Sequence, residues 1–74
     1  MKSITEQLFL FFQESRVTQS QLSRLSGVHQ VYICRLRKKA QADIASRRAD
    51  ALREAMWELD PAAAEKALGH GRPA

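Results

Sequence analysis

The sequence predicts an all-α protein, and three observations support this fold class. Apolar residues recur three or four positions apart, as Ile4, Leu8 and Phe11 do, and this spacing places side chains on one face of a helix. Residues that commonly cap helices precede several of these runs. Only 3 glycines and 2 prolines occur in the 74 residues. We expect a compact five-helix bundle in residues 1–69 and a flexible tail in residues 70–74.

Length and composition limit the class of protein further. A chain of 74 residues allows one domain with a small core, and dimerisation would add to its marginal stability. A single cysteine excludes an internal disulfide and fits the reducing cytoplasm. No apolar run reaches the length of a membrane span, so no membrane association is expected.

The first helix is expected over residues 4–14, with Ser3 as its N-cap. Ile4, Leu8, Phe11 and Phe12 form its core stripe. Phe9 and Leu10 lie off that stripe, so this helix is either covered on several sides or has a surface for a partner.

Two short helices are expected next, over residues 19–26 and 29–37. Thr18 is a good N-cap for the first of them, and Leu22 and Leu25 should share its inner face. Gly27 follows where a helix end often needs a positive φ. Ile33 and Leu36 should anchor the second helix. The arrangement is typical of a helix-turn-helix, in which the second helix enters the major groove of DNA.

The remaining helices are expected over residues 47–59 and 62–68. Ser46 can cap the former, and Asp60 with Pro61 is a strong start signal for the latter. Gly69 should end it. The inner stripe of the longer helix is Ala49, Leu52, Met56 and Leu59, and Ile44 should tether the preceding loop.

One window carries a family resemblance. The pattern Leu22-Ser23-x-x-Ser26-Gly27-Val28, followed by Ile33-x-x-Leu36, resembles the helix-turn-helix of the Cro/lambda-repressor-like (XRE-type) family. The resemblance implies a small helical bundle that binds DNA. Two positions depart from the family pattern. His29 stands where an N-cap Ser or Thr is usual, and Cys34 stands where a small polar residue is usual.

The charge distribution also favours a nucleic-acid partner over an ordinary solvated basic surface. The net charge is +4, and no acidic residue occurs between Glu14 and Asp43. The cations of that window are Arg16, Arg24, Arg35, Arg37, Lys38 and Lys39. A field of one sign over the proposed reading helix suits a polyanion.

Candidate contacts follow from the positions on the reading helix. The expected base contacts are Gln30, Val31, Cys34 and Arg35. The expected phosphate contacts are Gln19, His29, Tyr32, Arg37, Lys38, Lys39 and Arg47. Tyr32 could instead be a half-buried packing residue, and Cys34 could instead be a small residue that fills space. In the resembling family the residue at Gln19 braces the one at Gln30.

The resemblance implies a sequence-specific transcriptional regulator, most simply an autorepressor that binds an inverted-repeat operator as a homodimer. Such small regulators resemble those of phages and mobile elements. Trp57, Leu59 and Leu68 are the candidate dimer contacts, although Trp57 could instead cover the edge of the core. An antitoxin-type module with a protein partner and an interaction module that does not bind DNA are the alternatives. No enzyme activity, metal, cofactor or small-molecule ligand is expected, because the two histidines are far apart and there is a single cysteine.

Overall fold

The computed structural model describes residues 3–38 and 44–69, and this part of the chain contains helices and no strand. The all-α class is therefore confirmed. The radius of gyration is 10.8 Å, close to the roughly 11 Å expected of a compact chain of this length. The helices are α1 (Ile4–Glu14), α2 (Gln19–Ser26), α3 (Gln30–Arg37), α4 (Ser46–Leu59) and α5 (Pro61–Leu68).

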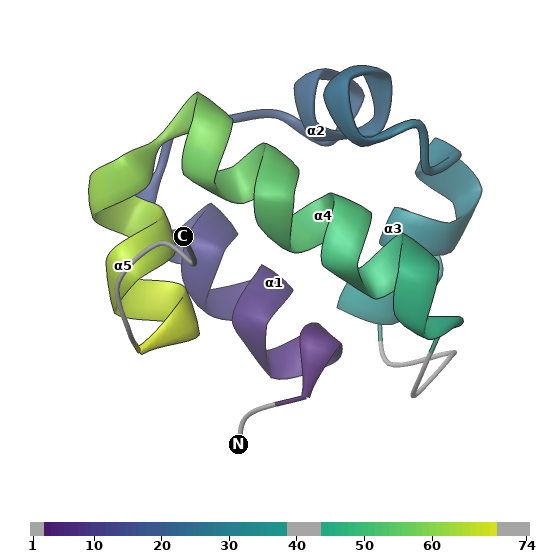
Figure 1. Cartoon of the computed structure of the whole chain (residues 1–74), viewed down its shortest axis with the longest axis horizontal. Helices are drawn as coiled ribbons and strands as arrows, with labels where there is room; N and C mark the ends of the chain where they lie inside the picture. Colours follow the sequence, from purple (N-terminus) through teal and green to yellow (C-terminus); the bar gives the residue numbers. More distant parts are fainter. Residues whose placement is uncertain (1–2, 39–43, 70–74) are drawn as a thin grey trace.

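The helices enclose one core. α1 packs against α3 and α5, α4 packs against α2 and α5, and α2 contacts α3. Figure 1 shows α4 crossing the middle of the molecule, with α5 on one side and α3 on the other. Each helix contributes buried side chains, and the largest that are fully buried are Phe11, Leu8, Leu22, Ile33, Leu36, Leu52 and Met56.

The predicted caps explain where most helices begin. The Ser3 hydroxyl accepts a hydrogen bond from the Glu6 N–H at 3.2 Å. Thr18 and Gln21 form a reciprocal capping box, in which each side chain accepts from the other residue's backbone N–H. Asp60 caps α5 as predicted, and the helix begins at Pro61, one residue before the expected range of 62–68. These caps satisfy N–H groups that the first turn of a helix leaves unpaired.

Two expectations meet a different outcome. Ser46 is not an N-cap, because α4 begins at Ser46 itself and Ala45 caps it without a side-chain hydrogen bond. Leu25 does not share the inner face of α2 with Leu22, since its side chain is 50% exposed. A separation of three residues leaves two side chains about 60° apart around a helix, and this narrow core covers only the first of them. Ile44 does pack against the core as expected.

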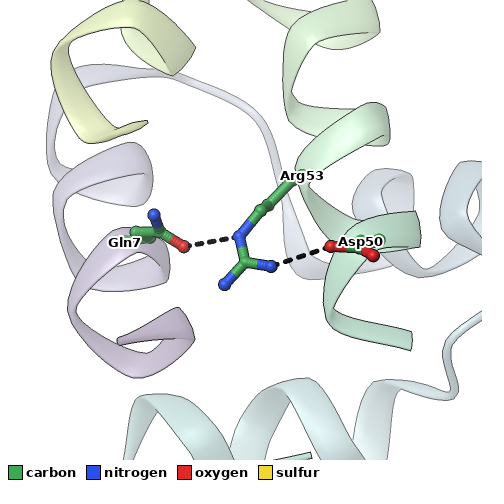
Figure 2. Close-up of polar contacts among 3 residues, drawn as sticks. All are labelled: Gln7, Asp50 and Arg53. Atoms are coloured by element: carbon green, nitrogen blue, oxygen red, sulfur yellow. Dashed lines mark hydrogen bonds and ion pairs between the residues drawn. The ribbon is translucent and has the colours of Figure 1, made fainter. Parts of the chain in front are cut away.

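A polar contact joins α1 to α4 (Figure 2). Gln7 is 2% exposed, and its Oε1 accepts a hydrogen bond from Arg53 Nε at 2.8 Å. Arg53 Nη1 also lies 3.0 Å from Asp50 Oδ1, one turn earlier on α4. The buried amide therefore depends on Arg53, while the Arg53–Asp50 pair lies at the surface. The hydrogen bond to Gln7 should therefore contribute more to the free energy of unfolding than the ion pair with Asp50.

This difference gives a stability prediction. Arg53→Met keeps the aliphatic stem but leaves Gln7 Oε1 buried without its donor, and this should lower the free energy of unfolding by about 1–3 kcal/mol. Asp50→Ala removes only the exposed ion pair and should change it by less than about 1 kcal/mol. Urea unfolding followed by circular dichroism measures both. Equal losses for the two variants would contradict the assignment of Gln7 as the dependent partner.

Candidate nucleic-acid interface

Serine side chains hold the turn between α2 and α3. Gly27 adopts a left-handed conformation with φ of 78°, which an L residue with a side chain rarely adopts. The Ser23 hydroxyl donates to the Val28 carbonyl at 2.7 Å, and the Val28 N–H donates to the Ser26 hydroxyl at 3.1 Å. Val28 itself is buried. The turn is therefore fixed both by hydrogen bonds and by an apolar anchor.

His29 caps α3. Its Nδ1 accepts a hydrogen bond from the Val31 N–H at 3.1 Å, so the imidazole does the work that a Ser or Thr oxygen does at other helix starts. An accepting Nδ1 carries no proton. The helix consequently begins at Gln30, one residue later than predicted.

The two sides of α3 differ in exposure. Ile33 and Leu36 are fully buried and turn one side of the helix to the core. Gln30, Val31 and Arg35 are exposed on the other side, and Cys34 is half-buried. The structure thus brings the four predicted base contacts together. With Gln19 and Lys38 they line one shallow groove.

Gln19 has a different partner from the one expected. Its Oε1 accepts a hydrogen bond from Arg37 Nη1, so it braces Arg37 instead of Gln30. The Arg37 guanidinium also lies 4.4 Å from the centre of the Phe12 ring. Arg37 is therefore held by two contacts within the chain. Lys38 is exposed, and Lys39 lies outside the described residues.

The start of α4 adds cations beside α3. The guanidinium of Arg48 lies 5.0 Å from the centre of the Tyr32 ring, and Arg47 next to it is exposed. Tyr32 is half-buried and packs against the core, which fits its packing role. Arg47 is the predicted phosphate contact of this pair, and the same argument applies to Arg48, because the helix dipole disfavours both cations at a helix start.

Arg35 on α3, Lys38 at its end, and Arg47 and Arg48 at the start of α4 are exposed cations, and Arg48 reaches α3 at the Tyr32 ring. No acidic residue occurs on α2 or α3 or in the first turn of α4. The first carboxylate along α4 is Asp50, which pairs with Arg53. A surface of one charge sign, built on a helix whose opposite side is anchored, can bind an extended polyanion.

The predicted dimer contacts are mostly inside the chain's own core. Trp57 is 6% exposed and Leu68 is 7% exposed, while Leu59 is half-buried. Trp57 therefore takes its alternative role at the edge of the core. These three side chains offer little surface to a second copy.

Neither metal ligands nor a membrane span are found in the part of the chain that the structure describes. Within residues 3–38 and 44–69, no group of three or more His, Cys, Asp and Glu side chains is placed to hold a metal ion. No helix there combines the length and the apolar character that crossing a bilayer requires. Compared with protein families, curated proteins and solved structures, the chain has no match.

The cap on α3 can be tested by substitution. His29→Ala removes the acceptor for the Val31 N–H and should lower the free energy of unfolding by about 0.5–2 kcal/mol. His29→Asn restores a side-chain acceptor and should match or exceed the stability of the original chain. Thermal unfolding of the two variants provides the comparison. A loss as large for His29→Asn as for His29→Ala would refute the capping role.

Proposed function

We propose that α2, the Gly27 turn and α3 form a DNA-binding helix-turn-helix, and that the protein is a sequence-specific transcriptional regulator. The observation that carries the proposal is the two-sided character of α3. Its inner side is anchored by Ile33 and Leu36, and its outer side presents polar and cationic side chains on a helix that has no acidic residue. The sequence resemblance to the Cro/lambda-repressor-like family supports the same function.

Three exposed side chains of α3 have a suitable partner on a base edge. The Gln30 amide can bond adenine at N6 and N7, and the Arg35 guanidinium can bond guanine at O6 and N7. Val31 can contact a thymine methyl group. Cys34, half-buried between them, gives the groove a small neutral floor.

The neighbouring cations would bind the phosphates. Lys38 ends α3, and Arg47 and Arg48 lie at the start of α4, so these charges flank the proposed reading helix. Contacts of this kind fix the orientation on DNA without reading its sequence. Arg37 contributes charge and also positions the end of α3 through Gln19 and Phe12.

The proposal includes a homodimer on an inverted repeat. A single module of this size buries too little surface for high specificity, and two-fold symmetry doubles the contacts with half-sites about one helical turn apart. The dimer surface must lie largely outside Trp57 and Leu68, because both are buried in the monomer. Autorepression in the cytoplasm is the simplest regulation for such a protein.

A selection from random duplex DNA tests the function directly. Repeated capture of DNA by the purified chain should enrich an inverted repeat. Its binding should weaken steeply with salt, because cations that contact phosphates release counterions. Enrichment of no common sequence, with equally weak binding to every duplex, would leave a basic helical bundle without the proposed function.

The role of Arg35 as a base reader can be tested by comparing it with Lys38, a second cation near the end of α3. Arg35→Ala should cost about 1–3 kcal/mol in binding to the selected sequence and much less in binding to random DNA. Lys38→Ala should weaken both by similar factors and reduce the salt dependence. Fluorescence anisotropy measures the dissociation constant of each of the two variants for each of the two duplexes. Parallel losses for Arg35→Ala on the two duplexes would exclude it as a base reader.

A further inference from the structure

A second groove borders the proposed DNA-reading side of α3. Phe9 and Phe12 of α1 line one wall, and Arg37 and Lys38 at the end of α3 line the other. The groove has a volume of about 540 Å³. Phe9 is 62% exposed, more than any other large apolar side chain among the described residues. Its exposure arises because the core uses the stripe of Ile4, Leu8 and Phe11, and Phe9 lies off that stripe.

Among the residues that the structure describes, the lining of the groove is apolar, polar and cationic and includes no carboxylate. The Arg37 guanidinium is positioned by the Phe12 ring, whose centre lies 4.4 Å away, and by a hydrogen bond to the Gln19 amide oxygen. A guanidinium has five N–H donors, and the bond to Gln19 uses one of them. Glu14, at the end of α1, is directed to Lys66 of α5 at 3.5 Å. An anion in this groove would therefore meet two cations without competition from a lining carboxylate.

We propose that this groove binds an acidic peptide segment of a protein partner, with an aromatic or aliphatic side chain of the segment packed against Phe9. Charge complementarity selects this occupant. A two-fold contact between copies would bring Arg37 and Lys38 close to their own counterparts, and like charges in a small interface oppose association. Duplex DNA meets the cations but offers little to cover an exposed phenyl ring.

The position of the groove gives the partner a regulatory role, and this step rests on the proposed function. Gln19, Cys34 and Lys38 line both this groove and the groove beside Gln30 and Arg35. A peptide seated against Lys38 would occupy a phosphate-binding cation and the edge of the reading side. Peptide and operator DNA should therefore exclude one another.

A direct titration tests the binding without DNA. The probe is a fluorescein-labelled peptide of about twelve residues, all Asp or Glu except for one Trp and two Leu, and the control peptide has Ser at those three positions. The full chain should bind the probe at least about tenfold more tightly than the control peptide, because only the probe buries apolar surface. Phe9→Ser should remove that preference.

Leu25→Ser supplies the matched protein control. Leu25 is 50% exposed, next after Phe9 among the large apolar residues that the structure describes, but it lies in a groove with Glu54 and Glu58 and should not attract an acidic probe. This variant should bind the probe as the original chain does. Circular dichroism melts should be alike for both variants, since each replaced side chain is at least half exposed. Equal binding of the two peptides, or equal losses for the two variants, would overturn the proposal.

Two further measurements distinguish the acidic peptide from the other possible occupants of the groove, which are DNA and a second copy of the chain. Phe9→Ser should leave affinity for the selected duplex and the sedimentation mass unchanged. A tenfold loss of DNA affinity would assign the groove to DNA, and a shift from dimer to monomer would assign it to a second copy. Addition of the probe to the DNA complex should release the duplex, and a stable ternary complex would refute mutual exclusion. The peptide titration stands even if no DNA sequence is enriched, so the failure of either proposal can be recognised separately.

Discussion

The burial of one side of α3 determines which side chains of the molecule are available to a partner. Ile33 and Leu36 are fully buried, and Val28 anchors the turn before them. Because helical side chains keep a fixed angular spacing, these anchors set the outward direction of Gln30, Val31 and Arg35 together. The serine hydrogen bonds around Gly27 fix the same turn from its polar side. The proposed function depends on this orientation more than on any single charged residue.

The rest of the bundle supports that orientation with a small core and a few polar contacts between helices. The chain has one cysteine and a small core, so packing between helices must provide most of its stability. Gln7 and Arg53 tie α1 to α4, and Arg37 ties the end of α3 to Phe12 and to Gln19. Under the proposed function, Arg37 would both stabilise the end of α3 and add to the charge that attracts DNA.

Local signals in the sequence predicted the helices well. Ser3, Thr18 and Asp60 cap the helices they were expected to cap, because N-capping depends on only a few neighbouring residues. Ser46 was misassigned, since a capping residue type at a helix start can also be the first helical residue. The exposed side of α3 followed from periodicity alone.

Contacts between distant segments could not be predicted in the same way. Gln7 and Arg53 are 46 positions apart, and nothing in either segment identifies the other as its partner. The same holds for Arg37 with Gln19, where Gln19 bonds the last residue of α3 instead of Gln30, the first residue of that helix. The burial of Trp57 depends on how α5 closes over the core. Periodicity gives the side of a helix, but not the element that covers it.

The most direct measurement of the central claim is an NMR titration of the ¹⁵N-labelled chain with the selected duplex. At this size every helix is represented by resolved backbone amides. We expect the largest shift changes on α3, at Gln19 and at the start of α4, while the amides of α5 stay nearly unchanged. Changes concentrated on α5, or spread evenly over the molecule, would contradict the claim that α3 is the reading helix.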